Sequence, residues 1–142
     1  MIRAVLDTNQ FICGLRDEKE FCADIVKLSG IKFTALASTT ILEEVFERLK
    51  ELEGKDFASL AIHIIKNLGI EVIDDKLVPK EIIQKYKNKG AKDADSVIAA
   101  FTEFVNADFL VTENRHFLKE IKINEFKTIK AEDFMKVIKA SK

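Results

Sequence analysis

An apolar run near the start of the chain ends abruptly in a carboxylate. Ala4, Val5 and Leu6 form a run that is typical of a strand buried on both faces, as in parallel sheets, and Asp7 follows at once. In open α/β folds, ligand crevices form at the carboxyl edge of the sheet, where such strands end. The sequence therefore predicts that Asp7 lies at the functional edge of a mostly parallel sheet.

Strand and helix signals alternate along the rest of the chain, which favours a single α/β domain over residues 1–142. Further strands are expected at residues 33–37, 70–73, 109–111 and 126–129. Helices are expected at residues 9–16, 18–28, 41–52, 57–68, 79–88, 94–105 and 131–140.

Composition and charge narrow the range of functions. A formal net charge of −1 provides no global attraction to nucleic acid, so that only a local basic patch could bind it. The apolar runs are far shorter than the roughly 20 residues of a membrane helix. The two cysteines, Cys13 and Cys22, match no zinc-binding spacing. We therefore expect a cytoplasmic protein without membrane contact, in which both cysteines are free thiols.

Other acidic side chains are expected at the same edge as Asp7, because helices in βαβ units begin where the preceding strands end. Oxygen ligands gathered in this way favour Mg²⁺ or Mn²⁺ over zinc, and a cation offsets the repulsion between carboxylates. Such an ion could activate water for attack on a phosphodiester. The side chains that this rule brings to the edge are Asp7, Glu43, Glu44, Asp93, Asp95, Glu113 and Asn114.

Each of these residues also has a structural interpretation. Asp93 could simply cap the helix over residues 94–105, and Asn114 could belong to a turn. Glu43 and Glu44 lie on opposite borders of the apolar stripe of their helix, so that periodicity does not choose between them. Asp7 is the hardest to explain structurally, because a carboxylate after a buried strand is costly without partners.

Four segments, in this order, resemble the motifs of the PIN domain, a family of metal-dependent nucleases that includes the VapC-type toxins of toxin–antitoxin pairs. The segment Val5–Asn9 is similar to the first motif, and residues 38–45 to the second, with Glu44 as its acid. Residues 93–100 resemble the third, in which Asp95 is the better match, and residues 110–117 the fourth. The fourth motif often carries Asp where this chain has Asn114, which puts a second metal ion in doubt.

The resemblance implies a three-layer α/β/α sandwich and a ribonuclease that depends on Mg²⁺ or Mn²⁺. Asp7, Glu44 and Asp95 would be catalytic, and Asp93 and Asn114 would join them as metal ligands. The Thr8 hydroxyl would orient Asp7 or a bound water. A cognate antitoxin and a second copy of the chain are further expected partners, on surfaces formed by residues 9–28 and 41–68.

Two basic segments flank the predicted acidic edge and could hold RNA phosphates in a salt-dependent way. One is the lysine-rich stretch over residues 76–92, in which Tyr86 could stack on a base. The other follows the fourth motif. The substrate-binding candidates are Thr8, Lys89, Lys92, Arg115 and His116.

Two other functions remain open. An aspartyl-phosphate phosphohydrolase would use Asp7 as nucleophile, but the second acid that such enzymes need two residues later is Asn9 here. A weakly active or inactive PIN-like module that binds RNA or protein would be compatible with Asn114 in the fourth motif.

Overall fold

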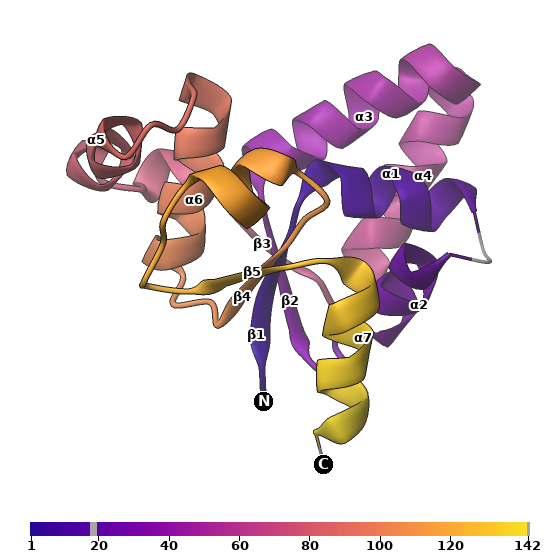
Figure 1. The fold of residues 1–142 in the computed structure, drawn as a ribbon. Coiled ribbons are helices and arrows are strands. Elements are labelled where there is room, and N and C mark those ends of the chain that lie inside the picture. The colour runs from indigo at the N-terminus through magenta and orange to yellow at the C-terminus, as the bar shows by residue number, and fades with distance from the viewer. Residues whose placement is uncertain (18–19, 142) are drawn as a thin grey trace.

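The centre of the molecule is a five-stranded parallel sheet in the order β3-β2-β1-β4-β5, shown in Figure 1. The computed structural model describes residues 1–17 and 20–141. Helices flank the sheet, which confirms the predicted α/β class. The strands are β1 (Arg3–Leu6), β2 (Thr34–Ser38), β3 (Glu71–Ile73), β4 (Phe109–Val111) and β5 (Lys127–Ile129).

The first strand lies in the middle of this sheet. Its residues Ala4, Val5 and Leu6 are fully buried, as their unbroken apolar run predicts. β1 pairs with β2 on one side and with β4 on the other, in the register Leu6 to Val111. The neighbouring position of β1 and β4 brings the residues after both strands to one point of the carboxyl edge.

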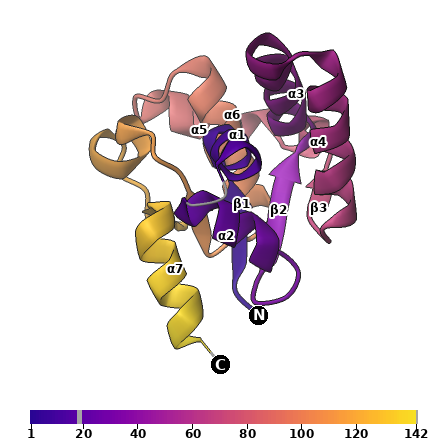
Figure 2. The same cartoon turned by 90° about the vertical axis from the view of Figure 1, so that its right-hand side faces the viewer.

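The helices form where periodicity and capping residues predict them. In Figure 1, α5 and α6 lie to the left of the strands and α1 to α4 to the right, while Figure 2 views α1 along its axis. Residues 18 and 19 of the predicted 18–28 helix lie outside the described residues. The helices are α1 (Thr8–Arg16), α2 (Phe21–Leu28), α3 (Thr39–Glu53), α4 (Lys55–Asn67), α5 (Lys80–Asn88), α6 (Asp93–Phe104) and α7 (Ala131–Ala140), with short turns η1 (Asp75–Leu77) and η2 (His116–Glu120). None of the described helices is long and apolar enough to cross a membrane.

Helix α3 starts directly where β2 ends. The Ser38 hydroxyl accepts a hydrogen bond from the Ile41 backbone N–H at 3.1 Å and so caps the helix. Ile41, Val45 and Leu49 are fully buried at helical spacing. This buried stripe fixes the rotation of α3 about its axis, and with it the direction of the acidic side chains in its first turns.

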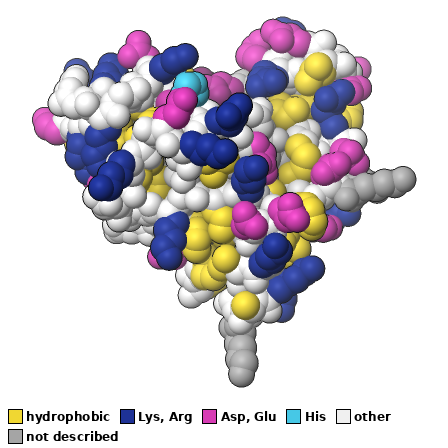
Figure 3. All heavy atoms as spheres, viewed as in Figure 1, with side chains coloured by type: hydrophobic (Ala, Val, Ile, Leu, Met, Phe, Trp, Pro, Cys, Tyr) yellow, Lys and Arg dark blue, Asp and Glu magenta, His cyan; other side chains and the backbone are white. Residues whose placement is uncertain are grey.

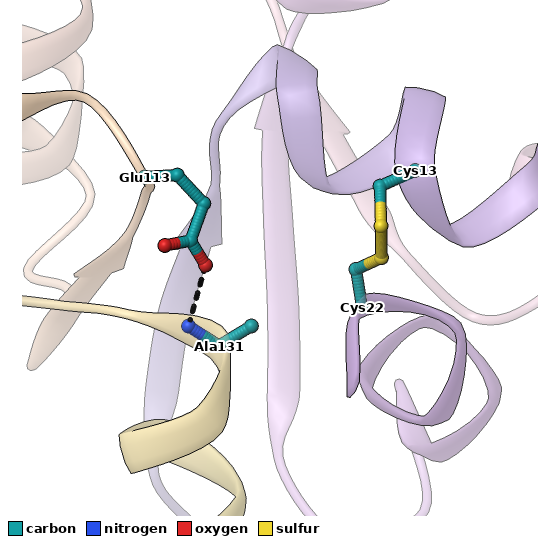
Figure 4. The surroundings of a disulfide bond; sticks show 4 residues. All are labelled: Cys13, Cys22, Glu113 and Ala131. Carbon is teal, nitrogen blue, oxygen red and sulfur yellow. Dashed lines mark hydrogen bonds between the residues drawn. A yellow bond between two sulfur atoms is a disulfide. The ribbon is translucent and has the colours of Figure 1, made fainter. Parts of the chain in front are cut away.

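The prediction that both cysteines are free thiols is wrong. Cys13 on α1 and Cys22 on α2 form a disulfide in this structure (Figure 4). Their Cα atoms are 6.0 Å apart, a normal spacing for this bond. Gly14 permits the close approach of the two helices, since a Cβ there would lie 2.8 Å from the Cys22 carbonyl oxygen and from Val26 Cγ2. Sequence spacing alone does not reveal this packing.

We expect reduction of this disulfide to lower the free energy of unfolding by roughly 2–3 kcal/mol, the value for a loop of this length in the chain-entropy model. Urea unfolding with and without dithiothreitol measures the change. The Cys13→Ser/Cys22→Ser variant serves as control, because its stability should not respond to dithiothreitol. Equal stability of the oxidised and reduced protein would contradict a stabilising bridge.

Candidate active site

Asp7 occupies the junction between β1 and α1 and is the most constrained acid of the sheet edge. Its backbone N–H donates to the Val111 carbonyl oxygen at 3.0 Å, which extends the pairing of β1 with β4 by one residue. Its side chain caps α1, with Oδ1 accepting from the Thr8 backbone N–H at 2.8 Å. Oδ2 accepts from the Thr112 hydroxyl at 2.7 Å, and the residue is only 6% exposed.

Burial of this carboxylate raises the pKa of Asp7 above its ordinary value. The hydrogen bonds from Thr112 and Thr8 oppose that rise in pKa, whereas the negative charges of Asp95 and Glu44 add to it. The ionised Asp7 is therefore less stable here than in water. A positive charge placed beside it would relieve both the burial and the repulsion.

Glu44, from the second turn of α3, is brought to the first turn of α1. Its Oε2 accepts a hydrogen bond from the Thr8 hydroxyl at 2.8 Å, and its side chain is half-buried. Glu43 is exposed and has no such bond in the described part of the chain. Of the two glutamates, it is therefore Glu44 whose side chain faces Thr8. The sequence predicts that the Thr8 hydroxyl orients Asp7 or a bound water. In the structure this hydroxyl donates its hydrogen bond to Glu44 instead.

Asp95 and Asn114 meet across the gap between α6 and the end of β4. The Asn114 Nδ2 lies 3.4 Å from Asp95 Oδ1 and donates to it, while Asn114 Oδ1 accepts from the His116 backbone N–H at 3.0 Å. The Asn114 backbone N–H in turn donates to the Thr112 hydroxyl oxygen at 3.0 Å. Asn114 therefore positions Asp95 and is itself held in place at both ends of its amide.

Thr112 is the residue of this network that sequence reasoning missed. It is fully buried, donates to Asp7 and accepts from Asn114, and so connects the ends of β1 and β4. Its signal was present in the sequence, because Thr112 directly follows the strand that neighbours β1 and ends opposite it. A hydroxyl directly after β4 can donate a hydrogen bond to a carboxylate directly after β1, the neighbouring strand in the sheet.

Two predicted acids point elsewhere. The Asp93 side chain is 96% exposed and lies 3.5 Å from the Lys87 amine in an ion pair. Glu113 Oε1 accepts from the backbone N–H of Ala131 at 3.1 Å, at the first residue of α7, as Figure 4 shows. Neither has a described contact with Asp7, Glu44 or Asp95.

The basic candidates divide into paired and unpaired side chains. The Lys89 amine lies 3.5 Å from Glu125, and the His116 imidazole pairs with Glu120. Lys92 and Arg115 are exposed, and in the described part of the chain neither has a side-chain partner. Figure 3 shows Lys and Arg side chains among acidic ones over the upper part of the molecule, beside a notch in its outline.

Tyr86 does not support the predicted base stacking. Its ring is fully buried and its hydroxyl donates to Glu103 at 2.8 Å. Burial and the neighbouring Glu103 hold the pKa of Tyr86 far above its ordinary value. The residue is part of the packing between α5 and α6, and the stacking prediction is wrong for this structure.

The donor chemistry at this edge fits a hard divalent cation. Asp7, Glu44 and Asp95 offer carboxylate oxygens, with no sulfur or imidazole among them. Their mutual repulsion raises the pKa of Asp7, which burial has already raised. Over the described residues, however, no three His, Cys, Asp or Glu side chains form a group arranged to hold an ion. Thr8 and Asn114 hold Glu44 and Asp95 by hydrogen bonds instead.

Comparison with protein families identifies a match to a model described as PIN domain, which covers residues 3–116. The matched range includes Asp7, Glu44, Asp95 and Asn114. It also includes the four segments that resemble PIN motifs, except Phe117 at the end of the fourth. No curated protein matches the chain.

Solved structures with a similar fold include two described as VapBC and one described as VapC20. DNA-bound VapBC from Salmonella typhimurium is 18% identical with a TM-score of 0.70, over 92% of this chain and 99% of that one. VapBC2 from Rickettsia felis, bound to a promoter DNA fragment, is 19% identical with a TM-score of 0.69, over 91% and 98%. Mycobacterium tuberculosis VapC20, described as a toxin that cleaves the sarcin-ricin loop, is 11% identical with a TM-score of 0.61, over 79% and 90%. At these identities the likeness shows the fold.

Proposed function

This chain belongs to the PIN domain family, and from that premise we propose that it is a metal-dependent endoribonuclease of the VapC toxin type. The observation that carries the proposal is the linked set of side chains at the carboxyl edge. Thr112 joins Asp7 to Asn114, Asn114 holds Asp95, and Thr8 holds Glu44. A buried, destabilised carboxylate among two others is poorly explained by stability alone.

In this proposal Asp7, Glu44 and Asp95 would hold Mg²⁺ or Mn²⁺. The bound ion would supply activation of water and stabilisation of negative charge at the scissile phosphate. Thr112 and the Thr8 backbone N–H would fix both oxygens of Asp7 in one orientation. Asn114 would fix Asp95 but add no charge, so the proposal requires only one metal ion. Asp93, with its exposed side chain, is left out of the ligand set.

The toxin assignment brings two further proposed partners. The similar structures from Salmonella and Rickettsia are described as VapBC complexes, which supports a cognate antitoxin for this chain as well. A homodimer stays a prediction. A binding module without activity is the second candidate function, favoured by the neutral Asn114 at the position where the family often carries Asp.

The proposal is tested by incubating the purified protein with a structured RNA in Mg²⁺, Mn²⁺ or EDTA. We expect cleavage that requires the metal ion and is abolished by EDTA. RNA binding without cleavage in either metal would overturn the nuclease proposal and favour the binding module. Cleavage that persists in EDTA would exclude the metal-dependent mechanism.

A further inference from the structure

Helix α3 forms one side of the candidate site, and its Arg48 has no assigned role so far. Arg48 lies four residues after Glu44, so that both side chains lie on the same face of α3. Its Nη1 donates to Asn9 Oδ1 on α1 at 3.1 Å. This bond lies next to the Thr8–Glu44 bond along the contact between the two helices.

The partner of Arg48 orients the guanidinium without neutralising it. Farther along the same two helices, Arg16 forms an ion pair with Glu53 at 3.0 Å. Arg48 has no carboxylate partner within the described residues, and the amide of Asn9 is neutral. Its remaining N–H groups therefore stay available to an anion. A planar guanidinium whose other N–H groups are available is well suited to bind two oxygens of one phosphate.

Arg48 also shares a surface hollow of about 290 Å³ with Glu44. The other side chains around that hollow are Thr40, Glu43 and Glu47, so that Arg48 provides its only positive charge among the described residues. Three glutamates would repel a nucleic acid that approaches Glu44 from this side. A guanidinium without a carboxylate partner at this place would instead attract the nucleic acid.

We infer that Arg48 binds a backbone phosphate of the RNA substrate on the α3 side of the site, adjacent to the scissile bond. The inference rests on the proposed ribonuclease function. It identifies a substrate contact on the side opposite α6, where the sequence placed Lys92. The Asn9 amide oxygen accepts one hydrogen bond from the same guanidinium.

The test measures the salt dependence of RNA binding in the absence of metal, in the Asp7→Asn background so that no cleavage interferes. The slope of log K against log salt concentration is negative, and we expect Arg48→Gln to make it less steep by about 0.7, the value for one phosphate contact to a single strand. Arg48→Lys should keep the slope and weaken binding, because the charge stays and the two-oxygen contact is lost. Lys50→Gln is the matched control: the same helix loses one exposed positive charge, two residues away, and the slope should change less.

The outcomes separate this inference from the proposed function. If Arg48→Gln and Lys50→Gln have the same slope as the parent, Arg48 is not a phosphate contact, whether or not the protein cleaves RNA. If the wild-type protein cleaves no RNA but the slope of Arg48→Gln is still less steep than that of the parent, the contact stands and the nuclease proposal fails. Circular dichroism melting of each variant checks that loss of the Arg48–Asn9 bond between α3 and α1 does not unfold the protein. Unfolding would weaken RNA binding at all salt concentrations and would not change the slope alone.

Discussion

Replacing Asp7 by Asn is expected to reduce metal-dependent RNA cleavage at least about 100-fold, the scale of losing several kcal/mol of charge stabilisation at the reacting phosphate. The amide has the same shape as the carboxylate, so that Oδ1 can still accept from the Thr8 backbone N–H. The Thr112 hydroxyl can rotate to accept from the new amide group. The fold should therefore survive while the central negative charge is lost.

The same variant should be at least as stable as the wild-type protein at neutral pH. The pKa of Asp7 is raised in the folded state, mainly by burial, so the folded protein binds this proton more tightly than the unfolded one. The stability associated with the protonated group is present at low pH and is lost as the pH rises through the folded-state pKa. The free energy of unfolding of Asp7→Asn minus that of the wild type should consequently increase with pH over that range.

Urea unfolding at several pH values and initial cleavage rates provide the two measurements. Asp56→Asn, the same chemical change at an exposed position of the first turn of α4, is the control. It should leave the cleavage rate unchanged and lower the free energy of unfolding by at most about 1 kcal/mol, because only a favourable charge at the start of a helix is lost. A variant of Asp7 that cleaves RNA at the wild-type rate would contradict the assignment of the site. Strong destabilisation at neutral pH would show that the carboxylate serves the fold.

The sequence was sufficient to predict the features of the site that follow from the order and direction of the strands. A strand that is apolar on both faces must lie inside the sheet, and β1 does, so the acid that ends it reaches the carboxyl edge. The pairing of β1 with β4 then brings Asp7 together with the residues after Val111. These relations depend only on element order and direction, which the periodicity of the chain encodes.

The features that could not be predicted depend on side-chain packing between distant elements. The disulfide requires the close approach of α1 and α2 at Gly14, and the Arg48–Asn9 bond requires α3 to lie beside α1. Glu113 follows β4 in the sequence, as a residue of the site should, but its side chain accepts a hydrogen bond from the backbone N–H of Ala131 and so caps α7. Neither periodicity nor spacing carries information about such competing partners.

Glu43 and Glu44 are the sharpest case of this limit, and they offer a matched pair of variants. They are adjacent, chemically identical and equally placed relative to the apolar stripe, yet in the described structure the Thr8 hydroxyl bonds Glu44. We expect Glu44→Gln to reduce metal-dependent cleavage at least roughly 10- to 100-fold, because loss of a residue that only supports a metal ligand already has an effect of that size. Glu43→Gln removes the same charge one residue away and should retain most of the activity.

The comparison distinguishes a ligand from a general electrostatic effect. Gln at position 44 can still accept the hydrogen bond from Thr8, so that only the charge at that oxygen is removed and the contact between α1 and α3 persists. If charge density near the hollow were all that mattered, the two variants would lose activity equally, and Glu44 would have no special role. A shift of the Mn²⁺ concentration needed for half-maximal cleavage in Glu44→Gln, but not in Glu43→Gln, would place the lost charge at the ion, because weaker ligation is offset by more metal.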